Sequence, residues 1–88
     1  MEWWERWETW LRDVAGEMDS QFMLWGEKDH DPFKWLTILM EEAGEAAQAA
    51  LGNREQKYRD ELIQVAAVAL SAVNCMDRQR DDLADDPR

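Results

Sequence analysis

Apolar side chains recur through the first quarter of the chain at intervals of seven residues. The residues that repeat every seven positions are Trp4, Leu11, Met18 and Trp25. Trp7 and Val14 lie between them and extend the same stripe. A seven-residue apolar repeat places its members on one face of an α-helix. Residues 2–25 are therefore predicted to form an amphipathic helix, with the amide of Gln21 on the same stripe.

Start and stop signals divide the rest of the chain into two further helices. Gly26 opens a polar break, and Asp31 followed by Pro32 is typical of a helix start. The carboxylate can cap free backbone N–H groups, and proline suits the first turn. Gly52 then ends a helix predicted over residues 32–51. A third helix is predicted to begin between residues 54 and 57 and to end near residue 78.

The third predicted helix is apolar on nearly every side between residues 62 and 73. Such a helix has to be buried on every side, and a chain of 88 residues has few other elements to cover it. The sequence therefore predicts an all-α antiparallel bundle of about three main helices per chain, completed by oligomerisation. We expect residues 1–80 to form a single domain and residues 81–88 to form an acidic, flexible tail.

The chain is strongly acidic, with 20 Asp and Glu residues against 10 Lys and Arg residues and a formal net charge of -10. Repulsion from phosphates argues against binding to a nucleic acid polymer, whereas a divalent cation suits this charge. Cys75 is the single cysteine, so no internal disulfide forms and a reducing compartment is expected. The N-terminus carries no signal-peptide pattern, and no apolar run reaches the length of a membrane span. We therefore expect a cytoplasmic protein without a membrane partner.

Acidic side chains interrupt the apolar second helix. Glu41, Glu42 and Glu45 lie on neighbouring positions of one helical surface, where like charges repel unless a cation lies among them. Glu61 and Gln64 lie three residues apart on the third helix, and an antiparallel hairpin brings them within reach of the first group. Oxygen ligands without nitrogen or sulfur partners select Mg²⁺, with Mn²⁺ as the alternative. The competing interpretation is a solvated acidic stripe.

These acidic segments resemble a known family signature. Glu41-Glu42-x-x-Glu45 followed by Glu61-x-x-Gln64 is similar to the E-E-x-x-E…E-x-x-D signature of the MazG-like, all-α nucleoside triphosphate pyrophosphohydrolases. The resemblance extends upstream to Trp25-Gly26-Glu27-x-x-His30 and Trp35-Leu36-x-Ile38-Leu39, which are similar to the segment that leads into the motif. It covers residues 21–77.

The resemblance implies hydrolysis of a (d)NTP to the (d)NMP and pyrophosphate with Mg²⁺, in house-cleaning or nucleotide-pool control, by a dimer or tetramer. It implies that Glu42, Glu45 and Glu61 bind the metal, and that Glu41 is a further ligand or orients the attacking water. Glu41 and Glu42 are thus the catalytic candidates. Gln64 departs from the family pattern, because an amide that can offer an oxygen to the metal, but no charge, replaces the aspartate.

The candidate substrate contacts are aromatic or polar residues near the acidic cluster in the predicted bundle: Gln21, Trp25, His30, Lys34, Asn74 and Asp77. Trp25 resembles an aromatic position that stacks on the base in related proteins. His30 is the single histidine and lies in a polar loop. For each candidate a structural role stays open, namely packing or solvent exposure, and Lys57 is interpreted as a surface charge.

Two further functions stay open. The negative charge and the tryptophan-rich first helix favour a non-catalytic acidic helical module that binds a protein partner or mimics nucleic acid. Gln64 favours a family member that binds nucleotides but has lost catalysis.

Overall fold

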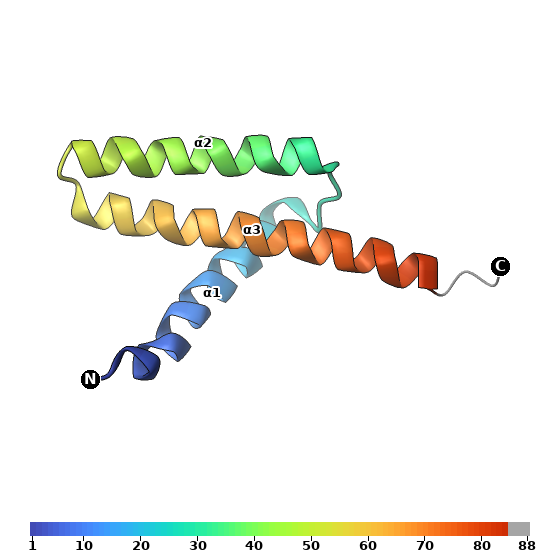
Figure 1. The fold of residues 1–88 in the computed structure, drawn as a ribbon, viewed down its shortest axis with the longest axis horizontal. Coiled ribbons are helices and arrows are strands. Elements are labelled where there is room, and N and C mark those ends of the chain that lie inside the picture. The colour runs from blue at the N-terminus through green and yellow to red at the C-terminus, as the bar shows by residue number, and fades with distance from the viewer. Residues whose placement is uncertain (85–88) are drawn as a thin grey trace.

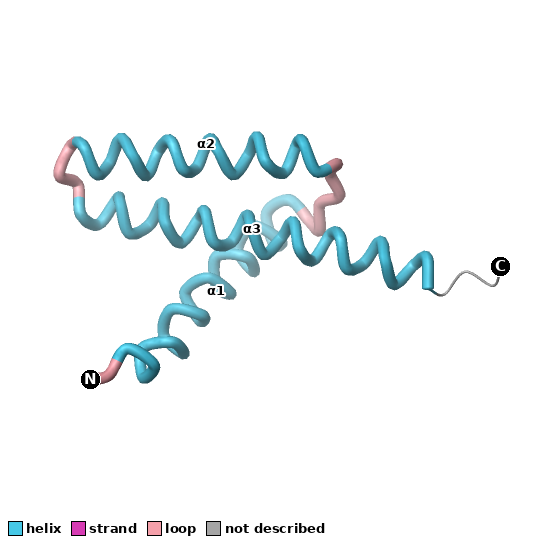
Figure 2. The backbone as a smooth tube through the Cα atoms, viewed as in Figure 1, coloured by secondary structure: helices cyan, strands magenta, loops and turns pink. Residues whose placement is uncertain are grey.

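The computed structural model describes residues 1–84 and consists of helices joined by short loops (Figure 1). A 3-10 turn, η1 (Trp3–Arg6), leads into α1 (Trp7–Trp25), and two longer helices follow, α2 (Pro32–Leu51) and α3 (Glu55–Ala84). Figure 2 shows that loops occupy only the N-terminus and the connections between helices, and residues 1–84 contain no strand. The predicted all-α fold with three main helices is confirmed.

The start of α2 follows from its local sequence. The side chain of Asp31 accepts a hydrogen bond from the backbone N–H of Lys34 at 2.8 Å, and Pro32 occupies the first turn. The carboxylate therefore satisfies one of the backbone donors that a helix start leaves without an intrahelical acceptor. The predicted start of this helix is confirmed.

A tight turn joins α2 and α3 into an antiparallel hairpin. The backbone N–H of Gly52 donates to the carbonyl of Gln48, and that of Asn53 donates to the carbonyl of Ala50. Asn53 has a φ of 57°, in the left-handed region that asparagine adopts more readily than most residues. The chain can reverse direction within a few residues as a result.

Small side chains fill the interior of the hairpin. Ala46 and Ala49 of α2 are buried, as are Ala67 and Val68 of α3. Helices with small residues at their contact can approach closely. The acidic residues of α2 are thereby held beside α3.

α1 packs on α3 and not on α2. It crosses the hairpin obliquely, and its N-terminal half projects away from the other helices (Figure 1). Val14 is the single buried residue of α1. The tryptophans of the N-terminal half lie on the predicted stripe or beside it, but α3 does not cover them: Trp3, Trp4, Trp7 and Trp10.

The three helices form an open arrangement. The radius of gyration is 15.4 Å, whereas a compact domain of this length has about 12 Å. Large apolar side chains remain exposed on all three helices. Even so, no helix within residues 1–84 is both long and apolar enough to cross a membrane.

Two helix boundaries differ from the prediction. The chain enters the first helix through a 3-10 turn, and Glu2 makes no side-chain capping bond there. α3 continues to Ala84 and so takes up the first part of the segment expected to be a flexible tail. Neither glycine nor proline interrupts residues 79–84, and Arg80 has a high helix propensity. The rest of the predicted tail, residues 85–88, lies outside the described residues.

Candidate metal centre and adjoining pocket

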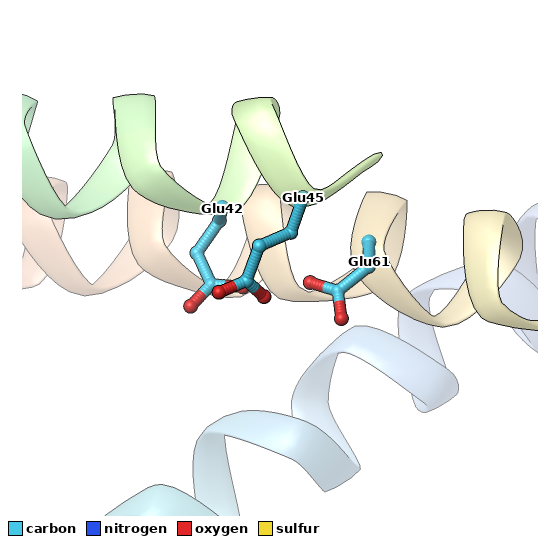
Figure 3. Close-up of side chains that lie close together, drawn as sticks. All are labelled: Glu42, Glu45 and Glu61. Atoms are coloured by element: carbon cyan, nitrogen blue, oxygen red, sulfur yellow. The ribbon is translucent and has the colours of Figure 1, made fainter. Parts of the chain in front are cut away.

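Three carboxylates from the two helices of the hairpin converge, as Figure 3 shows. Glu42 and Glu45 extend from α2 and Glu61 extends from α3, and one oxygen of each lies within 4.8 Å of the others. Ligand oxygens around an octahedral Mg²⁺ are separated by about 3–4 Å, given metal–oxygen distances of about 2.1 Å. Side-chain movements on the order of 1 Å therefore bring the three oxygens into one coordination shell.

The cluster lies at the edge of the hairpin. Glu42 and Glu45 share a face of α2 because they are three residues apart, and the antiparallel turn brings Glu61 opposite them. Glu61 is buried, Glu42 is half-buried and Glu45 is exposed. One side of the cluster therefore faces solvent, which suits an ion that keeps several water ligands.

Burial, together with the crowding of carboxylates, raises the pKa of Glu42 to about 7. Burial is the largest cause, followed by the hydrogen bond with Glu61 and the charges of Glu45 and Glu61. The pKa of Glu61 is lowered instead, mainly by its hydrogen bond with Lys57. A proton shared by this pair therefore resides on Glu42, which is about half protonated at neutral pH.

The two oxygens of Glu61 have different surroundings. Oε1 accepts a hydrogen bond from the ammonium group of Lys57 at 2.7 Å, and this contact raises the pKa of Lys57. Oε2 is buried and, when its neighbours are ionised, has no donor within the described part of the chain. A buried acceptor without a partner costs about 1–3 kcal/mol. A proton on Glu42 or a bound cation removes this cost.

A pocket of about 510 Å³ adjoins the cluster, and Glu42 lines it as well. It lies between α1, the loop that follows α1, and the two hairpin helices, and its lining combines aromatic, apolar and polar side chains: Met18, Gln21, Phe22, Trp25, His30, Trp35, Ile38, Gln64, Val68, Ser71 and Asn74. Apolar walls with a few converging polar groups are typical of small-molecule sites.

Aromatic rings form part of this pocket wall. The rings of His30 and Trp35 meet edge to face, with centroids 4.7 Å apart. The indole Nε1–H of Trp35 is buried and has no acceptor among residues 1–84. A ligand with an oxygen or nitrogen acceptor near this donor would satisfy it.

Gln64 belongs to the pocket wall. Its side-chain oxygen accepts a hydrogen bond from the amide of Gln21 at 2.9 Å, and Gln21 also donates to Glu17 at 3.2 Å. The atom of Gln64 that could bind a metal is thus engaged with α1. The two amides join α1 to α3 across the pocket.

The loop between α1 and α2 is fastened to α3. Arg78 forms ion pairs with Glu27 at 3.3 Å and with Asp29 at 2.6 Å. Asn74 donates to Glu27 at 2.9 Å, and the thiol of the buried Cys75 lies 3.7 Å from the carbonyl oxygen of His30. These contacts hold His30 at the pocket.

Most of the predicted site residues are brought together in the structure. Glu42, Glu45 and Glu61 form the carboxylate cluster. The pocket contains the other residues that the structure assembles: Gln21, Trp25, His30, Gln64 and Asn74. The structure thus places eight of the predicted residues in two adjoining groups, and their binding of a metal and a substrate stays a prediction.

Three predicted residues lie apart from both the cluster and the pocket. Glu41 is exposed and lines a separate shallow groove with Phe33 and Met40. It is rotated by about 100° from Glu42 on the helix, which turns it away from the cluster. Lys34 and Asp77 are exposed and do not line the pocket.

Sequence reasoning missed three contributors. Trp35 was named only as part of the segment that leads into the acidic motif, and it lines the pocket. Lys57, interpreted as a surface charge, pairs with Glu61, and its position four residues before that glutamate was the available signal. Ser71 follows Gln64 by seven residues, a spacing that places both on one helical face.

No protein-family profile, curated protein or solved structure matches the chain. Three carboxylates beside an aromatic pocket can bind a hard divalent cation and present it to a ligand in that pocket.

Proposed function

We propose that the protein is a Mg²⁺-dependent nucleotide pyrophosphohydrolase that converts a (d)NTP to the (d)NMP and pyrophosphate. The observation that carries the proposal is the position of Glu42, which belongs to the carboxylate cluster and also lines the aromatic pocket. A nucleoside triphosphate needs both parts, a cation for its phosphate oxygens and a pocket for its base. The resemblance of the acidic motifs to the MazG-like family supports the same assignment.

The donor set fits Mg²⁺, with Mn²⁺ as the alternative, because every ligand is a carboxylate oxygen. Glu42, Glu45 and Glu61 would hold the ion, and the buried Oε2 of Glu61 would gain the partner it otherwise lacks. The bound ion would polarise the reacting phosphorus centre and lower the pKa of a coordinated water.

The residues of the chain supply positioning and proton control. Glu42 borders both the cluster and the pocket, which suits the task of orienting the attacking water. Lys57 neutralises Glu61 and holds its carboxylate in place. Glu41, to which the resemblance gave a catalytic role, is exposed outside the cluster, and we give it no such role.

The pocket suits a nucleobase. Trp25 and Trp35 offer aromatic surfaces for stacking. The amides of Gln21, Gln64 and Asn74 can hydrogen-bond to the edge of the base. A panel of nucleotides identifies the base that these amides select.

The proposal includes homo-oligomerisation and action on the cytoplasmic nucleotide pool. Apolar side chains exposed on all three helices support self-association. The single cysteine, present as a free thiol, supports a reducing compartment.

A nucleotide panel tests the proposal directly. The purified protein is incubated with Mg²⁺ and canonical or modified triphosphates, and pyrophosphate release is measured. We expect activity with at least one nucleotide and a loss of at least about 100-fold in Glu45→Gln. Glu41→Gln is the matched control and should retain activity. No release from any nucleotide, at enzyme concentrations where a known pyrophosphohydrolase is active, would contradict the proposal.

One observation favours a second candidate, nucleotide binding without hydrolysis. Gln64 carries no charge and is hydrogen-bonded to Gln21, whereas the signature it resembles has an aspartate at this position. Calorimetry with a non-hydrolysable triphosphate, combined with assays of Gln64→Asp, separates the two candidates. Binding by the wild type without turnover, together with activity in Gln64→Asp, would establish the second candidate.

A further inference from the structure

The outer side of α2 carries a continuous apolar stripe. Its large members are spaced three, four and eleven residues apart and are strongly exposed: Phe33 at 81%, Leu36 at 58%, Met40 at 66% and Leu51 at 86%. Gly44 and Ala47 fill the interval between Met40 and Leu51. Spacings of three and four residues keep all of these positions on one helical face.

This outer stripe lies opposite the face of α2 that packs on α3. Ala49 is buried in the hairpin and follows Met40 by nine residues, a rotation of about 180° around the helix axis. Within the described residues, neither α1 nor α3 approaches the outer stripe. Packing of α2 on α3 explains why the inner face of α2 is apolar. It does not explain why the outer stripe is apolar as well.

The chain exposes more surface than a domain of its size. Its accessible surface is 7072 Å², whereas a folded monomer of this mass exposes about 5,400 Å². The excess is about 1,700 Å². A stable protein–protein interface buries about 800 Å² per partner, and obligate dimers bury more. This excess is spread over all three helices, and about half of it would supply one side of a stable interface.

The outer stripe is complementary to itself when two copies run antiparallel. A two-fold axis beside residue 42 sets Met40 over the partner's Gly44, Leu36 over the partner's Ala47 and Phe33 beside the partner's Leu51. A side chain added at Gly44 would meet nothing within 4 Å in the single chain, so this position is open to an incoming methionine. Alternation of large and small side chains allows helix surfaces to interdigitate.

We propose that the outer stripe of α2 is an interface between two antiparallel copies of this chain. The proposal does not depend on the catalytic assignment, because the stripe faces away from the carboxylate cluster. Lys34, Glu41 and Gln48 flank the stripe along one edge and remain at its solvent-exposed rim. Since each chain carries a net charge of -10, added salt strengthens the association.

Two methionine substitutions test the surface. Met40→Glu places a charge on the stripe, and Met23→Glu, at a position 83% exposed on α1, is the matched control. Sedimentation equilibrium measures the dimer dissociation constant, with circular dichroism to verify helical content. We expect the dissociation constant to rise at least about 100-fold in Met40→Glu, because both copies of the side chain leave the interface. Met23→Glu should dimerise as the wild type does.

Disulfide trapping tests the orientation in protein that keeps the wild-type stripe largely intact. Met40→Cys is mixed with Gly44→Cys under mild oxidation, and the two chains are distinguished by mass. An antiparallel pair gives mainly the mixed disulfide, whereas a parallel pair gives disulfides between identical variants. The buried Cys75 does not compete. A monomeric wild type, wild-type dimerisation in Met40→Glu, or loss of the dimer in Trp7→Ala with Met40→Glu unaffected would each overturn the proposal.

Discussion

Replacement of Glu42 by glutamine distinguishes two effects on the stability of the protein. One is the protonation of Glu42, and the other is the binding of a metal ion by the carboxylate cluster. The pKa of Glu42 is about 7 in the folded chain and 4.5 without the fold. When folding raises the pKa of a carboxyl group, the group makes its full contribution to the free energy of unfolding at pH values below its pKa in the unfolded chain. That contribution is lost as the pH rises from about 4.5 through about 7. Glutamine mimics the protonated form at every pH, so it should stabilise the metal-free protein above pH 7 and leave it unchanged below pH 4.5.

The magnitude follows from the pKa difference. A rise from 4.5 to about 7 corresponds to about 3.4 kcal/mol between the two protonation states. Solvent on the open side of the cluster screens the carboxylate charges. The expected destabilisation by ionised Glu42 is therefore reduced to about 1–2 kcal/mol. For a chain of this length the melting temperature of Glu42→Gln should therefore exceed that of the wild type by about 5–15 °C in EDTA at pH 8.

Mg²⁺ should reverse this advantage. An ion at 10 mM with a dissociation constant on the order of 1 mM stabilises the wild type by about 1.4 kcal/mol. Glu42→Gln lacks one of the three carboxylates and should gain much less. Glu41→Gln is the matched control, because Glu41 lies outside the cluster, and it should respond to Mg²⁺ as the wild type does. Differential scanning calorimetry at pH 5 and pH 8, with and without Mg²⁺, measures all of these effects.

Two results would refute the reasoning. A lower melting temperature of Glu42→Gln than of the wild type in EDTA at pH 8 would mean that the ionised carboxylate stabilises the fold. Equal stabilisation of both proteins by Mg²⁺ would mean that the cluster is not an ion site. That second result would favour the acidic interaction module.

Two further predictions concern the carboxylate cluster, and a third concerns the start of α2. Lys57→Met should destabilise the metal-free protein and tighten Mg²⁺ binding, because the ammonium group pairs with Glu61 and competes with the ion; unchanged affinity in calorimetry would contradict this. Mg²⁺ binding should release protons at pH 6.5 but few at pH 8.5, since the pKa of Glu42 is about 7. Titrations in buffers of different ionisation enthalpy count these protons, and equal release at both pH values would count against the assignment. Asp31→Ala should cost about 1 kcal/mol through loss of the helix cap, whereas Asp31→Asn should retain most of the stability in thermal unfolding.

Helix boundaries marked by local chemistry could be predicted from the sequence. Asp31 and Pro32 begin α2, and Gly52 closes it, because capping and backbone freedom depend on neighbouring residues alone. The end of α3 has no such signal, and the helix continues to Ala84. The direction of α1 was also beyond prediction. Trp7 continues the stripe of Val14, yet α1 diverges from α3 at that point and leaves Trp7 exposed.

The carboxylate cluster could be predicted because helical spacing and a short turn fix its geometry. Which of two adjacent glutamates faces α3 depends on the rotation of α2 about its axis. The burial of Ala46 and Ala49 sets that rotation and turns Glu42 inward and Glu41 outward. The bond between Gln21 and Gln64 joins residues that are 43 positions apart. Such a contact depends on how α1 crosses α3, which no local pattern encodes.

The short turn after α2 has a consequence for the order in which the molecule assembles. All three carboxylates lie within residues 42–61, so closing one small loop brings them together. The pocket additionally needs α1, which joins the hairpin through contacts with α3 alone. The hairpin can thus form the ion site while α1 is still detached. In native-state hydrogen exchange, the amides of α1 should therefore open at lower free energy than those around Glu42 and Glu61. The ion site would persist through fluctuations that dismantle the pocket.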